Sequence, residues 1–209
     1  SDPTPHVKNN AGAGVFSSTS GIVFVDSGSN TGSSTGQIDI SASTVATHVI
    51  TYTDTDAETA TFTLNINALP TIVISTTNSS ICNGASTTLT ASGASGYSWS
   101  NGETTPAITV SPTSTTTFTV TGTDENGCTN TASQSITVNA LPTVEISGTL
   151  TYCAGATTTL TATAGLSSYS WSTGETTQSI DVTAGSYTVT GTDSNGCSAT
   201  SSPATVTEL

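Results

Sequence analysis

Tyr97-Ser98-Trp99-Ser100-Asn101-Gly102-Glu103-Thr104-Thr105 decides the fold, because nearly the same stretch returns as Tyr169-Ser170-Trp171-Ser172-Thr173-Gly174-Glu175-Thr176-Thr177. Each copy places a Tyr and a Trp just before a glycine-containing turn, a pattern typical of a short strand that leads into a hairpin. A repeat of roughly 70 residues is too long for a solenoid unit and suits a small domain in a tandem array. The sequence therefore predicts repeated modules and not one enzyme-sized domain.

Other motifs recur in the same order around this stretch. They are Leu69-Pro70-Thr71 with Leu141-Pro142-Thr143, Cys82-Asn83-Gly84-Ala85 with Cys153-Ala154-Gly155-Ala156, and Gly122-Thr123-Asp124-Glu125-Asn126-Gly127-Cys128 with Gly191-Thr192-Asp193-Ser194-Asn195-Gly196-Cys197. The chain before them has no cysteine, yet its second half has similar strand patterns and it also ends on Asn-Ala-Leu-Pro. We predict three domains, spanning residues 1–68 (without a disulfide), 69–140 and 141–209.

The composition favours strands over helices. The chain has 49 Thr and 33 Ser but only one Lys or Arg, with a formal net charge of −13. Threonine is β-branched and fits a pleated sheet, and it alternates here with apolar residues, as in Ser135-Ile136-Thr137-Val138-Asn139. Turn signals every 8 to 12 residues or so indicate antiparallel sandwiches of about seven strands. We expect an all-β fold of tandem Ig-like antiparallel β-sandwich domains in an extended array, joined by short linkers of one or two residues.

The same composition would also suit a disordered stalk, but each cysteine-bearing repeat has the aromatic residues and cysteines needed to fill and close a core. The shortage of basic residues argues against nucleic acid and anionic lipid surfaces as partners. No apolar run reaches the ~20 residues that span a bilayer, so we expect no membrane insertion. With no signal peptide at Ser1, the chain is expected to be a mature fragment of a longer secreted protein.

Four cysteines fall two to a repeat, at Cys82 and Cys128 and at Cys153 and Cys197. A zinc site would show a close Cys-x-x-Cys pair or histidine ligands, and neither is present. The matching spacings predict two disulfides, each within one repeat, and hence an oxidising, extracellular compartment.

No hydrolase or nucleotide-binding motif is present, so we expect no enzyme activity and no catalytic residues. Asp54, Asp56 and Glu58 form a candidate calcium site, since three carboxylates within five residues repel one another unless a cation or solvent relieves them. The Asp-Asn turns before Cys128 and Cys197 also offer oxygen ligands, although such residues form turns without any metal.

Trp99 and Trp171 are interpreted as core aromatics, with Tyr97 and Tyr169 packing inward beside them. The alternative is that the tryptophans are exposed platforms on which sugars stack, which would make the repeats carbohydrate-binding modules.

The ordered series of Cys, Tyr-Ser-Trp-Ser, Gly-Glu-Thr-Thr and Thr-Asp-x-Asn-Gly-Cys motifs resembles the Ig-like or PKD-like repeats of large Bacteroidota surface adhesins, such as the gliding-motility adhesin SprB. The resemblance covers residues 70–209 well and residues 15–69 more weakly. It implies a stalk segment of a cell-surface adhesin or gliding-motility filament exported by type IX secretion. The cysteines that follow the Asn-Gly turns depart from the antibody pattern. Their disulfides are expected to act as mechanical clasps within each domain.

The resemblance also implies the partners of this chain, which are neighbouring domains of one long protein and other surface or secretion-system proteins. The alternative function is an accessory, carbohydrate-binding Ig-like region of a secreted polysaccharide-degrading enzyme.

Overall fold

The computed structural model describes residues 15–24, 38–53 and 56–209, and every regular element in them is a β-strand. The fold is therefore all-β, as predicted. The chain divides into two compact units, one formed by residues 1–70 with 123–129 and the other by residues 71–122 with 130–209. We refer to residues 69–140 as the second repeat and to residues 141–209 as the third repeat.

The first unit contains an antiparallel sheet with the strand order β1-β2-β3. Its strands are β1 (Val15–Ser18), β2 (Ala46–Thr53) and β3 (Thr59–Ile66). Phe16, Ile50 and Ile66 are buried in one core together with Phe24. The core is also aromatic, because the ring centroids of Phe16 and Tyr52 lie 5.0 Å apart.

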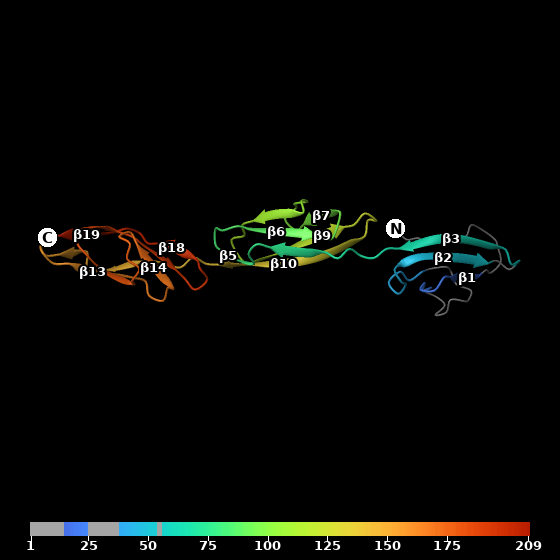
Figure 1. Ribbon diagram of the computed structural model, residues 1–209, viewed down its shortest axis with the longest axis horizontal. Coiled ribbons are helices and arrows are strands. Elements are labelled where there is room, and N and C mark those ends of the chain that lie inside the picture. The colour runs from blue at the N-terminus through green and yellow to red at the C-terminus, as the bar shows by residue number, and fades with distance from the viewer. Residues whose placement is uncertain (1–14, 25–37, 54–55) are drawn as a thin grey trace. The chain divides into compact units, whose positions relative to one another are not determined.

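The second repeat has seven strands in two sheets (Figure 1). They are β4 (Val73–Thr76), β5 (Ser80–Cys82), β6 (Thr87–Ser92), β7 (Gly96–Trp99), β8 (Ala107–Val110), β9 (Thr116–Thr123) and β10 (Thr129–Asn139). One sheet has the order β4-β6-β8, and the other has the order β5-β10-β9-β7. Within the second sheet, β5 runs parallel to β10 and pairs with its last three residues, Thr137 to Asn139.

Both sheets of the second repeat contribute to one core, so the repeat is a sandwich. The buried side chains are Ile81, Leu89, Ala91, Trp99, Ile108, Val110, Phe118, Val120 and Ile136. Along β9, buried Phe118 and Val120 alternate with half-buried or exposed threonines, which is the period of two that a half-buried strand requires. Leu89, Val120 and Ile136 are fully buried, and each contributes about 2 kcal/mol of hydrophobic stabilisation.

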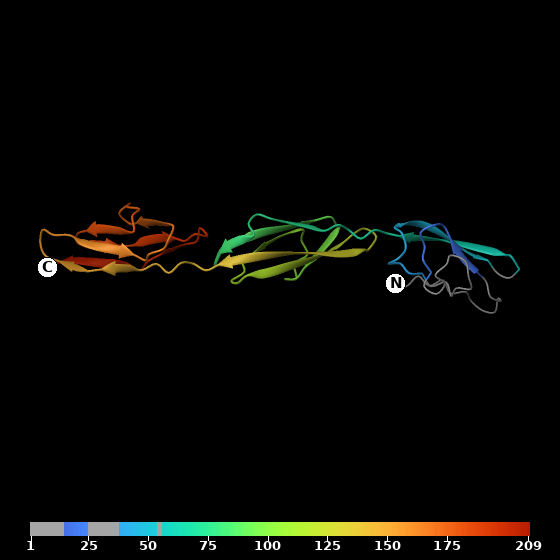
Figure 2. The same ribbon diagram turned by 90° about the horizontal axis from the view of Figure 1, so that it is seen from below.

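The third repeat has the same architecture with its long strands interrupted; Figure 2 shows its strands from below. They are β11 (Ile146–Gly148), β12 (Thr151–Tyr152), β13 (Thr158–Ala162), β14 (Ser168–Trp171), β15 (Ser179–Val182), β16 (Gly185–Tyr187), β17 (Val189–Thr192), β18 (Ser198–Thr200) and β19 (Ala204–Glu208). The sheet orders are β11-β13-β15, β12-β19-β16 and β14-β17-β18. Pro203 lies between β18 and β19, where a residue without an N–H interrupts a ladder. The core of this repeat is separate from that of the second.

Hydroxyl pairs on the exposed sides of these sheets account for much of the Thr and Ser content. Thr119 and Ser133 lie 2.8 Å apart between their hydroxyl oxygens, and Thr190 and Thr200 form an equivalent pair at 2.8 Å. Cross-strand pairs of this kind stabilise a sheet by about 0.2–1 kcal/mol each. The sheets therefore present many hydrogen-bonded hydroxyl groups to water.

Two features of the strand pattern were not predicted. Strands β5 and β12 are too short to show an alternation of apolar and polar residues, and only their pairing with the last strand of each repeat defines them. The segments between the last strand of one repeat and the first strand of the next are residues 67–72 and 140–145, longer than the one or two residues expected.

Gly122 in β9 tests the packing of the second repeat. A Cβ at this position would overlap Ile72 Cδ1 and lie 2.9 Å from the Cβ of Ala94, whereas a Cβ at Gly96 would meet nothing within 4 Å. We expect Gly122→Ala to lower the free energy of unfolding of the second repeat by about 1–3 kcal/mol through overpacking. Gly96→Ala should change it by less than about 0.5 kcal/mol. Urea denaturation followed by Trp99 fluorescence, in a Trp171→Phe background, measures both, and equal losses in the two variants would contradict the packing described.

Candidate functional site

The structure places the two repeated tryptophans inside the sandwich cores. Trp99 and Trp171 are each 3% exposed. Tyr97 and Tyr169 are half-buried and pack against the same cores. A platform for sugar stacking needs an open aromatic face, and neither indole has one.

The Gly-Glu-Thr-Thr motif satisfies the polar group of each buried tryptophan. The indole Nε1 of Trp99 donates a hydrogen bond to the carbonyl of Thr105 at 2.9 Å, and that of Trp171 donates to the carbonyl of Thr177 at 2.8 Å. The backbone N–H of Trp99 donates to the carbonyl of Glu103 in the same turn. A buried N–H without a partner would cost about 1–3 kcal/mol, so the turn and the tryptophan form one structural unit.

The candidate calcium ligands lie at the edge of what the structure describes. Asp54 is outside the described residues, while Asp56 and Glu58 lie between β2 and β3. Within the described part of the chain, no three His, Cys, Asp or Glu side chains come together as a metal site. Calcium at Asp54, Asp56 and Glu58 therefore stays a prediction.

The structure corrects the cysteine pairing expected from the spacing. Cys82 of the second repeat bonds to Cys197 of the third, with 5.5 Å between their Cα atoms. Cys128 and Cys153 are free thiols. The expected disulfides within each repeat, and the clasps within each domain that they would have formed, are therefore wrong.

Strand β10 explains why the two cysteines of one repeat do not meet. Cys128 directly precedes this strand, and Cys82 is paired with Asn139 at its far end. Eleven residues of strand at about 3.3 Å each place the two cysteines on the order of 30 Å apart. A disulfide needs Cα atoms within about 7 Å of each other, so pairing within the repeat is geometrically excluded.

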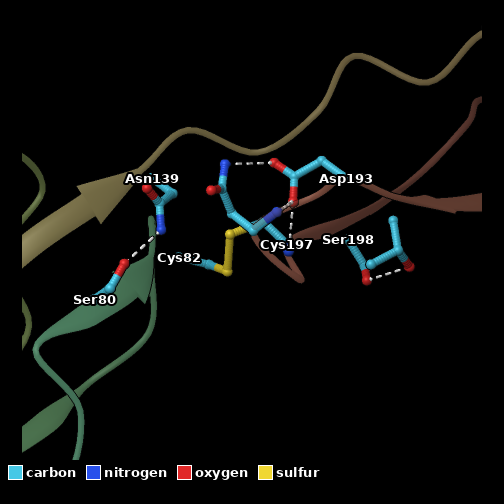
Figure 3. The surroundings of a disulfide bond; sticks show 8 residues. Ser80, Cys82, Asn139, Asp193, Cys197 and Ser198 are labelled. Carbon is cyan, nitrogen blue, oxygen red and sulfur yellow. Dashed lines mark hydrogen bonds between the residues drawn. A yellow bond between two sulfur atoms is a disulfide. The ribbon is translucent and has the colours of Figure 1, made fainter. Parts of the chain in front are cut away.

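A tight turn holds Cys197 in position (Figure 3). The Oδ1 atom of Asp193 accepts hydrogen bonds from the backbone N–H groups of Asn195 and Cys197, both at 2.8 Å. The backbone N–H of Asp193 donates to the carbonyl of Cys197, and Gly196 adopts a φ of +81° that closes the turn. The aspartate is thus a structural acceptor, and Cys197 itself is fully buried.

Cys82 is held by the end of the last strand of its own repeat. It pairs with Asn139 in the parallel ladder, and the backbone N–H of the following residue, Asn83, donates to the carbonyl of Asn139 at 2.8 Å. The side-chain amide of Asn139 donates to Ser80 Oγ, also at 2.8 Å (Figure 3). The disulfide therefore starts where the chain leaves the second repeat, beside the linker of residues 140–145.

Two carboxylates in turns have lowered pKa values. A hydrogen bond from the Ser41 side chain is the main cause at Asp39, with a smaller contribution from the backbone N–H of Ala42. At Glu175, a hydrogen bond from the Thr173 side chain is the main cause. Both groups are local turn acceptors, and within the described residues neither belongs to a group of three or more His, Cys, Asp or Glu side chains that could hold a metal ion.

The chain has two histidines, of which the structure describes His48. His48 is a core residue. It is 2% exposed, and its Nε2 atom lies 2.9 Å from the carbonyl oxygen of Thr44. A ring enclosed in this way has no access to a substrate. The described residues also contain no helix of the length and apolar character that crossing a membrane demands.

No family model matches this sequence, and the search of curated proteins found no match. Solved structures do show similarity. A calcium-stabilised adhesin with which an Antarctic bacterium binds ice is 20% identical over 78% of this chain and 56% of its own, with a TM-score of 0.37. A structure from a 1.5-MDa bacterial ice-binding adhesin is 15% identical over 96% of this chain and 87% of its own, with a TM-score of 0.34.

A third structure, of murine CEACAM1b, is 13% identical over 66% of this chain and all of its own, with a TM-score of 0.34.

Denaturation of single-tryptophan variants distinguishes a disulfide between repeats from disulfides within them. Trp99 reports on the second repeat and Trp171 on the third, because each lies in a separate core. In the Trp171→Phe background, we expect Cys197→Ser to lower the free energy of unfolding reported by Trp99 by about 2–4 kcal/mol, since the bond restricts the unfolded chain of both repeats.

Cys128→Ser and Cys153→Ser are the matched controls, and each should change that value by less than about 0.5 kcal/mol. Pairing within each repeat would produce the opposite result, with Cys128→Ser destabilising the second repeat and Cys197→Ser leaving it unchanged.

Proposed function

We propose that this chain is a structural stalk segment of an extracellular cell-surface adhesin, made of three tandem sandwich domains at residues 1–68, 69–140 and 141–209, with no catalytic activity. The observation that carries the proposal is the Cys82–Cys197 disulfide between successive repeats. A covalent bond between successive repeats suits a chain that must keep its length under load.

The disulfide supports a load-bearing role because it changes the covalent path through the molecule. A pulling force that reaches Cys82 crosses directly to Cys197 and bypasses the residues between them. The two cysteines are 115 residues apart in the sequence. At about 3.5 Å per residue, the bypassed segment would span roughly 400 Å if it were fully extended. Both repeats can lose their noncovalent structure without releasing that length.

The linker shows why such a bond is useful. Residues 140–145 contain no strand, and without the disulfide they would be the covalent connection through which load passes from one repeat to the next. With it, the two repeats have two covalent connections that start at neighbouring positions, Asn139 and Cys82. Two connections restrict the bending that a single linker allows.

The same bond supports the proposed extracellular location. Disulfides form and persist in oxidising compartments and are rare in the cytosol. The surface also suits exposure to water, with a formal charge of −13 and many hydroxyl groups on the sheets.

A carbohydrate-binding accessory region is the function that the structure supports less well. That role requires aromatic side chains to be exposed, and both tryptophans are buried with their N–H groups hydrogen-bonded inside the sandwich.

Single-molecule pulling tests the stalk role directly. The oxidised chain, held at its two ends, should release little length when the second and third repeats unfold, because residues 83–196 are bypassed. Added reductant should increase the total released contour length by roughly 400 Å. Cys197→Ser should behave like the reduced protein without any reductant, and Cys128→Ser should behave like the oxidised protein. Equal extension in all four cases would remove the mechanical basis of the proposal.

The location is tested separately on intact source cells. An antibody raised against residues 69–209 should label the cell surface without permeabilisation, and external protease should abolish the labelling. Labelling that needs permeabilised cells would exclude the surface role even if the pulling experiment succeeds.

A further inference from the structure

We infer that Cys153 is the attachment site for a following sandwich domain, through a disulfide to the cysteine of an Asp-x-Asn-Gly-Cys turn in that domain. The partner chemistry is taken from the pair already formed in this molecule, in which Cys82 bonds to the cysteine that ends such a turn. The inference holds whether or not the protein is an adhesin, because it depends only on the equivalence of Cys153 and Cys82.

The backbone around the two cysteines is the same. The N–H of Ala85 donates to the carbonyl of Cys82 at 2.9 Å, and the N–H of Ala156 donates to the carbonyl of Cys153 at 3.1 Å. The glycine inside each turn has a left-handed conformation, with a φ of +89° at Gly84 and +79° at Gly155. Each cysteine is therefore the first residue of the same tight turn.

The strand pairing next to the two cysteines is also the same. Just as β5 runs parallel to the end of β10, β12 runs parallel to the end of β19, with Tyr152 opposite Glu208. The N–H of Leu209 donates to the carbonyl of Tyr152 at 2.9 Å, immediately before Cys153. In both repeats the last strand ends beside the cysteine, so a domain attached after that strand begins close to its sulfur.

The surface around Cys153 is open. Its side chain is exposed and its thiol is free, whereas Cys82 is only partly exposed and bonded. Residues on both sides of Cys153 line a surface hollow of about 560 Å³, among them Tyr152, Gly155 and Glu208. A turn from a following domain has space to approach the sulfur here.

The partner turn forms without a disulfide, as Cys128 shows. Its thiol is free, yet Asp124 Oδ1 accepts hydrogen bonds from the N–H groups of Asn126 and Cys128 at 2.8 Å, as Asp193 does in the bonded turn. The turn is thus preorganised before oxidation. By the same pairing rule, the partner of Cys128 would lie in the preceding domain, but residues 1–81 contain no cysteine.

The bond formation needs an external oxidant. The two thiols lose two protons and two electrons as the S–S bond forms, and a disulfide such as oxidised glutathione accepts them and is reduced to two thiols. No other group of the protein takes part.

The test uses the full chain with a second copy of residues 140–209 fused after Leu209, oxidised in a glutathione buffer and mapped by non-reducing peptide mass spectrometry. The added copy carries Cys153→Ser, so that the Cys153 peptide comes from the native repeat alone, and we expect this peptide to be bonded to a Cys197 peptide in most molecules. The native Cys82–Cys197 bond serves as the internal control for folding and oxidation. A Cys153 that is alkylated, or bonded to any other cysteine, would overturn the inference.

A matched variant and a second measurement keep the test decisive. Cys197→Ser in the added copy alone should return Cys153 to full alkylation with the native bond unchanged. If the added copy does not fold, as judged by its tryptophan emission, the parent protein from source cells decides instead. Its Cys153 peptide should be linked to a peptide that contains Asp-x-Asn-Gly-Cys, and a free thiol there would contradict the inference.

Discussion

The parallel pairing of β5 with the end of β10 is the constraint on which the rest of the structure depends. It places Cys82 at the point where the chain leaves the second repeat, while the length of β10 keeps Cys128 at the opposite end. Each repeat therefore carries one cysteine at each end of its sandwich. Bonding within a repeat is impossible at that separation, and bonding to the next repeat becomes the natural pairing.

The repeated motifs have structural roles within each sandwich. The Tyr-Ser-Trp-Ser strand fills the core, and the Gly-Glu-Thr-Thr turn accepts the indole hydrogen bond. The Asp-x-Asn-Gly-Cys turn uses its aspartate to hold backbone N–H groups, and the Cys-x-Gly-Ala turn presents the other cysteine. Carboxylates and aromatic rings that could suggest chemistry in isolation are used here for folding and joining. What the motifs produce together is a module with two different, complementary ends.

Much of this could be predicted from the sequence, and the reason the rest could not is physical. The all-β fold follows from local alternation and turn residues, which act over a few positions. The cysteine pairing depends on which end of the sandwich each residue occupies, and spacings of 46 and 44 residues carry no such information. The pairing of Cys82 with Asn139 shows at which end of the sandwich Cys82 lies. This pairing could not be predicted, because β5 is only three residues long and shows no alternation of apolar and polar residues. The calcium prediction is a different case, since Asp54 lies outside the described residues.

The two unlike ends also determine how such modules assemble. A contact between the Cys-x-Gly-Ala end of one module and the Asp-x-Asn-Gly-Cys end of the next is heterologous, so it builds an open, directional chain instead of closing into a symmetric dimer. Within such a chain, the bypassed residues contribute almost no extensible length. In the proposed stalk, extension under load comes from modules without the bond, and residues 1–68, which contain no cysteine, are that kind of module. The proposed stalk would then combine inextensible and extensible segments, and the presence or absence of cysteine at a boundary would decide between them.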